Sequence, residues 1–185
     1  MKRPYLPVDT VYATAILSPV RTLAQFYWAR SASFGKPLIL LDFDTGPLTA
    51  SSWKEVASRL TMFEETRRAR FGALGVYIEN EILVAQADAS GATPHLIPSH
   101  ISADTSWQMV CQSAASFLAR GDIGYLQSAS DKMDKHPFLN ASGVYAGPRT
   151  DEPTVPAFLY GIVLGLDEAA ARDPKAKAPK RSARS

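Results

Sequence analysis

Residues 147–169 read GPRTDEPTVPAFLYGIVLGLDEA, an apolar run that follows two acids. From Val155 onwards the apolar residues recur at helical spacing, which predicts a helix with one buried face. Thr150 or Asp151 is placed to cap this helix, and Glu152 falls in its first turn, where a negative charge favours the helix dipole. The same carboxylates could instead be ligands of a metal ion. The choice depends on whether other elements bring carboxylates to the same place.

The composition indicates a globular chain of one domain. At 185 residues, with 46% hydrophobic and 21% charged residues, the chain is long enough for one sizeable core. Its single cysteine, Cys111, excludes an intrachain disulfide framework, and its place on an apolar helical face predicts a packed thiol. The apolar runs are too short to span a bilayer, so we expect no membrane partner.

The charge is distributed unevenly along the chain. Residues 172–185 contain six basic residues and one acid, so this segment carries +5 and the rest of the chain carries −3 of the net +2. We therefore expect a domain over 1–171 and a disordered basic tail over 172–185. Such a tail can neutralise phosphates of a polyanion, or it can serve only to keep the chain soluble.

Strands alternate with capped helices along the rest of the sequence. Residues 1–19 are rich in β-formers, and residues 23–32 favour a strand over a short helix. Residues 82–87 fit either a helix or a strand. Residues 128–146 indicate a loop or a short helix. The clearest expected strands are 37–43, 74–78, 95–97 and 122–126. Three helices are expected most clearly. The first covers 52–71 and begins with a capping-box pattern at Ser52 and Glu55. The second is capped by Asp104, Thr105 or Ser106 and ends at Gly121, and the third is the final helix. This order predicts an α/β sheet with helices on its faces.

Acids stand beside three of these elements. Asp9 is early in the chain, Glu79 follows the strand at 74–78, and Asp151 precedes the last helix. Ligand sites of α/β sheets collect at the carboxyl ends of the strands, and carboxylates that meet there raise each other's pKa unless a cation is present. Mg²⁺ or Mn²⁺ suits such oxygen ligands, and two such ions can stabilise the attacking and leaving oxygens of a phosphodiester.

Several short motifs, in this order, resemble the ribonuclease H-like nuclease superfamily, and most of all the C-terminal nuclease domain of phage terminase large subunits. They are 37–42 (PLILLD), the Trp53 helix, 75–80 (GVYIEN), 119–125 (ARGDIGY), and 150–152 (TDE) before 156–160 (PAFLY). The resemblance covers residues 5–170. It implies a mixed central sheet flanked by helices, an endonuclease that cuts DNA with two Mg²⁺ or Mn²⁺ ions, and a role in viral DNA packaging, with other packaging proteins as partners in the cytoplasm of a bacterial host.

Carried over to this chain, the resemblance makes Glu79 the ligand from the middle strand, Asp151 or Glu152 the ligand from the last helix, and Asp9 the ligand from the first strand. Because Pro7 interrupts the first strand, Asp42 or Asp44 is the substitute for Asp9. No G-x-x-x-x-G-K-[ST] phosphate loop occurs, so the chain lacks a packaging ATPase. Contacts to the DNA backbone are expected from Arg67, Arg68, Arg70, Arg149, Lys180 and Arg181.

Three alternatives stay open. A Holliday-junction resolvase shares the superfamily layout and a similar size. A non-catalytic member would keep the fold as a module that binds nucleic acid or protein. Residues 40–45 (LLDFDT) also resemble the first motif of haloacid dehalogenase-type phosphatases, with Asp42 as nucleophile and Asp44 as acid/base, and with Ser128, Lys132 or Lys135, and Asp151 in the later motifs.

Overall fold

The centre of the molecule is a mixed six-stranded sheet with strand order β5-β4-β1-β2-β3-β6. The computed structural model describes residues 9–30, 35–66, 72–140 and 145–166. The strands are β1 (Thr10–Leu17), β2 (Thr22–Arg30), β3 (Leu38–Pro47), β4 (Gly72–Ile78), β5 (Pro94–Leu96) and β6 (Ile123–Tyr125). β2 runs antiparallel to its neighbours β1 and β3, whereas β1–β4, β4–β5 and β3–β6 pair in parallel. The carboxyl ends of all strands except β2 therefore lie at one edge, here called the carboxyl edge.

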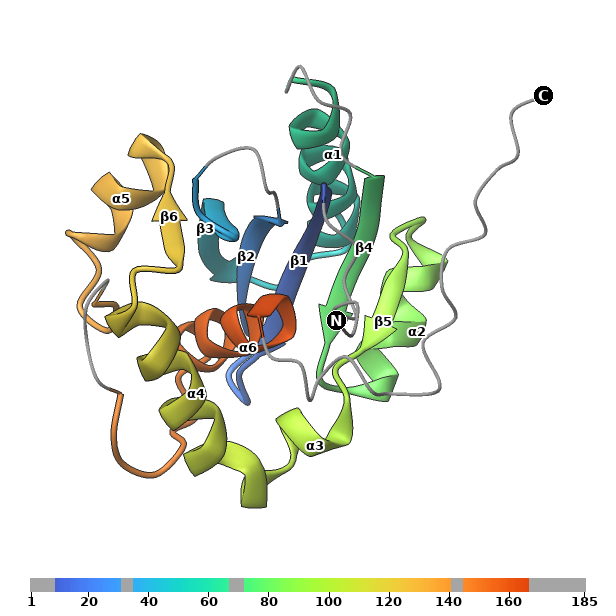
Figure 1. Ribbon diagram of the computed structural model, residues 1–185. Coiled ribbons are helices and arrows are strands. Elements are labelled where there is room, and N and C mark those ends of the chain that lie inside the picture. The colour runs from blue at the N-terminus through green and yellow to red at the C-terminus, as the bar shows by residue number, and fades with distance from the viewer. Residues whose placement is uncertain (1–8, 31–34, 67–71, 141–144, 167–185) are drawn as a thin grey trace.

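Helices cover both faces of the sheet (Figure 1). They are α1 (Ser52–Glu65), α2 (Glu81–Ala89), α3 (Ser99–Ser102), α4 (Trp107–Ala119, after a 3₁₀ turn at Asp104–Ser106), α5 (Gln127–Met133) and α6 (Thr154–Leu166). One core joins α4, α5 and α6 to residues such as Tyr12, Phe26 and Trp28. The other joins α1 and α2 to residues such as Ala13 and Tyr27. Alternation along β1 and β2 supplies both cores, since successive side chains point to opposite faces.

The final helix, α6, packs directly on β1 and β2 and is buried around almost its whole circumference. Gly161 lies so close to Trp28 that a Cβ there would overlap the indole ring. Tyr12 donates a hydrogen bond to the carbonyl of Gly161 (2.7 Å), and Thr14 donates one to that of Ala157 (2.8 Å). The sequence predicted one buried stripe, but the helix lies between the sheet and α4, so it is covered on both sides.

The expected α/β architecture, a mixed central sheet flanked by helices, is confirmed, and the structure settles several local expectations. Residues 23–32 do contain a strand, and 82–87 belong to helix α2, which Asn80 caps by accepting a hydrogen bond from the Ile82 N–H. Helix α1 ends at Glu65 instead of reaching residue 71. Its N-cap is Ser51, whose hydroxyl bonds to that of Thr49 and makes no capping hydrogen bond. The Ser52 hydroxyl accepts a hydrogen bond from the Thr49 N–H, so the expected capping box at Ser52 is absent. No described helix is long and apolar enough to cross a membrane.

Candidate functional site

The carboxyl edge between β1, β4 and the start of α6 is the place that the sequence singled out for function. Glu79 directly follows β4, and residues 148–153 cross this edge on their way into α6. A cleft of about 580 Å³, here called the edge cleft, lies at this point, and Arg149, Asp151 and Glu152 are among the residues that line it. The candidate acids from the middle strand and the last helix therefore do reach one edge.

The Glu79 carboxylate forms an ion pair with the guanidinium of Arg149. Arg149 Nη1 lies 2.6 Å from Glu79 Oε1, and Arg149 Nη2 lies 2.6 Å from Glu79 Oε2, a two-point ion pair. Asp104 Oδ1 is 3.7 Å from Arg149 Nη1, and the guanidinium carbon lies 5.7 Å from the centre of the Tyr160 ring. Partial burial acts to lower the pKa of Arg149, but the hydrogen bond of Glu79, together with electrostatic interactions with Tyr160, Glu79 and Asp104, raises it. The arginine is therefore a fixed positive charge at the centre of the site.

The two acids before α6 have different surroundings. Glu152 Oε1 accepts a hydrogen bond from the Thr154 N–H (2.9 Å), and Oε2 accepts one from the Val155 N–H (3.2 Å). Glu152 is thus the residue that caps α6, instead of Thr150 or Asp151. Asp151 is exposed and makes no hydrogen bond or ion pair with the described part of the chain.

The assignment of Asp9 as the first-strand ligand is wrong, because Asp9 lies at the opposite end of β1. Thr10 pairs with Gly72 at the start of β4, whereas Ala15 pairs with Ile78 at its end. Asp9 therefore lies about 20 Å from Glu79 at the rise of a β-strand. No acid occurs between Thr10 and Arg21, so neither β1 nor the turn after it can supply a carboxylate.

The substitutes Asp42 and Asp44 lie elsewhere as well. They lie two residues apart on the face of β3 that α1 covers. Both form ion pairs with Arg59 of α1 and Lys132 of α5. Lys132 Nζ is 2.6 Å from Asp42 Oδ1 and 3.2 Å from Asp44 Oδ1. A phosphatase would need these two acids free in a pocket, but they form a closed ion-pair network that ties two helices to β3.

Two Mg²⁺ or Mn²⁺ ions do not fit the donor set of the described residues. Glu79 is bound by Arg149, Glu152 is bound by the start of α6, and Asp9 is far away. Among the residues that the structure describes, no three His, Cys, Asp or Glu side chains are grouped so as to hold a metal ion. The remaining candidates for DNA contacts, Arg67, Arg68, Arg70, Lys180 and Arg181, lie outside the described residues, so those predictions stay open.

Sequence reasoning missed the partner of Glu79. Arg149 was expected to contact DNA, and Asp104 was expected only as a helix cap. The available signal was the position of Arg149, two residues before Asp151, because any element that brings Asp151 to the edge also brings this arginine. A single sequence does not show that the guanidinium turns towards β4.

Comparison with known proteins supports the fold. No family model matches the chain, and no curated protein matches it. In solved structures, the large terminase of a thermophilic bacteriophage is similar at a TM-score of 0.56 with 11% identity over 86% of this chain, and a second crystal form gives 0.57. The yeast mitochondrial Holliday junction resolvase aligns over 91% of this chain and 84% of its own at 13% identity, but its TM-score of 0.45 supports no inference.

The match covers 40% of the terminase chain, so this chain spans about two fifths of that protein. Together with the sheet order, the likeness shows that the chain has a ribonuclease H-like α/β fold. At 11% identity the likeness describes the fold alone.

Proposed function

We propose that this chain is a nucleic-acid-binding module that keeps a nuclease fold without cutting its ligand. The observation that carries the proposal is the ion pair of Glu79 with Arg149, at an edge where β1 contributes no acid. A cation held by the protein itself neutralises the carboxylate that a metal would otherwise use. Cleavage by two ions needs several carboxylates free to bind them, whereas among the described residues of this edge Glu79 is bound by Arg149 and Glu152 by the start of α6.

Nucleic acid is the proposed ligand because the basic residues are concentrated in segments that flank the folded elements. The tail over 172–185 carries +5, and Arg67, Arg68 and Arg70 follow α1 closely. These residues, with Lys180 and Arg181 of the tail, would bind DNA phosphates, so affinity should fall steeply as salt rises. Arg149 is a weaker candidate for this role than the others, because Glu79 already neutralises its charge.

A second candidate is the metal-dependent endonuclease that the resemblance implies, with a part in phage DNA packaging. One observation favours it beyond the fold: Asp104, Asp151 and Glu152 line the same edge cleft, and Asp151 has no partner among the described residues. This function requires Arg149 to leave Glu79, and it then requires Mg²⁺ or Mn²⁺ and DNA at the edge.

One pair of assays separates the candidates. Supercoiled plasmid is incubated with the full chain and Mn²⁺ or Mg²⁺, and binding of labelled DNA is measured over a range of salt concentrations. We expect salt-sensitive binding and no nicking, with the Asp151→Ala variant indistinguishable from wild type in both assays. Metal-dependent nicking that is lost in Asp151→Ala would establish the endonuclease, and absence of binding at low salt would refute both candidates.

A further inference from the structure

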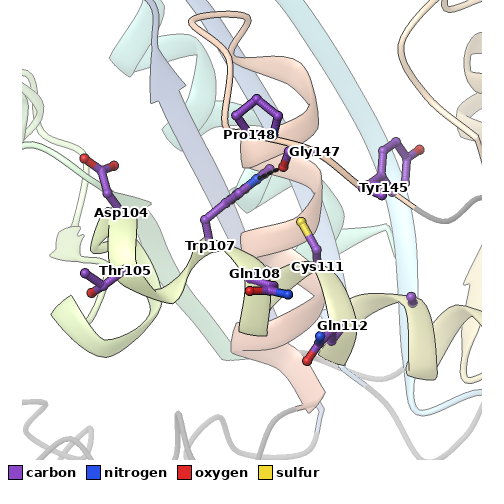
Figure 2. Close-up of a pocket in the computed structure, with 11 residues that line it drawn as sticks. Asp104, Thr105, Trp107, Gln108, Cys111, Gln112, Tyr145, Gly147 and Pro148 are labelled. Carbon is purple, nitrogen blue, oxygen red and sulfur yellow. Dashed lines mark hydrogen bonds between the residues drawn. The ribbon is translucent and has the colours of Figure 1, made fainter.

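A larger cleft adjoins the edge cleft and has a different chemical character. It lies between α4 and residues 145–148, has a volume of about 720 Å³, and is here called the α4 cleft (Figure 2). Trp107 Nε1 donates a hydrogen bond to the carbonyl of Gly147 (3.0 Å), which holds this segment across the helix. The volume lies in the range of small-molecule pockets, about 300–1,000 Å³.

Uncharged groups dominate its walls. Gln108 and Gln112 lie one turn apart on α4, both are exposed, and neither amide bonds to any other described residue. Burial raises the pKa of the Cys111 thiol and of the Tyr145 phenol, so both groups are neutral near pH 7. Asp104 brings the only charge among the side chains that line the cleft, and it lies at one end in Figure 2.

We infer that the α4 cleft binds an unpaired base of a nucleic-acid strand. This inference rests on the proposed function. A base has flat apolar faces that can lie against the half-buried ring of Tyr145, and a polar edge that an amide can bind through a donor and an acceptor at once. An anionic small ligand would find no cation among the lining residues, and a paired base has its faces and one edge already occupied.

The position of the cleft fits a strand that lies along the carboxyl edge. The α4 cleft and the edge cleft share Asp104, Trp107 and Pro148, so the two are continuous. A third cleft of about 250 Å³ continues from Tyr145 to Phe138, whose exposed ring offers a second stacking surface. Stacking on exposed aromatic rings tolerates any base. We therefore expect the cleft to prefer single strands to duplex, without preference for a particular sequence.

The test compares binding of labelled single-stranded oligoadenylate and of a labelled duplex by fluorescence anisotropy. In the full chain, Gln108→Ala combined with Gln112→Ala should weaken single-strand binding roughly tenfold, as expected for two lost hydrogen bonds, and leave duplex binding unchanged. Gln86→Ala, an exposed glutamine on α2, is the matched control and should bind as wild type does. Gln112→Trp, which fills the cleft, should weaken single-strand binding at least as much.

The outcomes distinguish this inference from the proposed function. If wild type binds both forms and the double variant and Gln112→Trp bind single strands normally, the α4 cleft is not the base site, although the module still binds nucleic acid. Equal weakening for single strands and duplex would also overturn the inference. If wild type binds neither form, the proposed function fails and the inference fails with it.

Discussion

The middle of α6 and its amino-terminal end meet the sheet in opposite ways. In the middle, Gly161 lies against Trp28, and hydroxyls of β1 bond to helix carbonyls, so the contact is buried and closely fitted. At the end, Glu152 caps the helix, Arg149 pairs with Glu79, and clefts open between the side chains. The packed middle therefore holds α6 on the sheet, whereas we expect function to depend on which charges the edge retains.

The largest expected effect comes from disturbing the packed middle. Gly161→Ala places a methyl group inside the indole of Trp28, and overpacking of this kind should lower the free energy of unfolding by about 3 kcal/mol. Urea unfolding followed by circular dichroism measures the change. Gly46→Ala is the control, because a Cβ there meets no atom within 4 Å and the free energy should change little. Equal effects of the two substitutions would contradict the account of α6.

The next largest effect on stability is expected from breaking the ion pair at the amino-terminal end of α6. Arg149→Ala leaves the Glu79 carboxylate, about three quarters buried, without its partner, and should lower the free energy of unfolding by about 2 kcal/mol. Adding Glu79→Gln should recover part of the loss, since the unpaired charge is then removed. Arg120→Ala breaks the more exposed pair with Asp122 and should change stability by less than about 0.5 kcal/mol. A double variant that is no more stable than Arg149→Ala would show that the pair is not the relevant interaction.

A smaller effect on stability should distinguish Glu152 from Asp151, the two acids before α6. Glu152→Ala removes the group that binds two helix N–H donors and should lower the free energy of unfolding by about 1 kcal/mol. Asp151→Ala touches no such contact and should change it by less than about 0.5 kcal/mol. Thermal unfolding of both variants under the same conditions tests the order. If Asp151→Ala is the more damaging substitution, the assignment of the cap is wrong.

The smallest effect is expected at Asp9. Asn tolerates the left-handed backbone at this position (φ 61°) as well as Asp does, so Asp9→Asn changes little besides the charge. Both stability and nucleic-acid affinity should equal those of wild type within about 0.5 kcal/mol. Loss of nucleic-acid binding in this variant would mean that the amino end of β1 contributes to the interface.

Much of the fold could be predicted from the sequence, because it depends on local patterns. The apolar run that forms β3 and the helical spacing of residues 155–166 identify their elements. Other features depend on contacts between distant residues. Helix α6 begins at Thr154, and Glu152 accepts hydrogen bonds from its first N–H groups. From residue type alone, Thr150 and Asp151 were equally suitable caps.

The candidate site could be predicted only in part. Glu79 and Asp151 both lie at the carboxyl edge, as expected, and their role as metal ligands stays a prediction. Asp9 was misplaced because β1 begins at Thr10, so the acid precedes the strand instead of ending it. The partners that neutralise the acids come from far along the chain: Arg149 is 70 residues from Glu79, and Lys132 is 90 from Asp42. Residue type and spacing do not encode such pairs.

We propose that Arg149, and not a metal ion, balances the Glu79 carboxylate at the carboxyl edge. Titration of the full chain with Mn²⁺, followed by electron paramagnetic resonance of the free ion, tests it most directly. The account predicts that wild type leaves the free Mn²⁺ signal as it is in buffer, with no specific site. Stoichiometric binding of two Mn²⁺ ions that is lost in Glu79→Gln and in Asp151→Ala would contradict it.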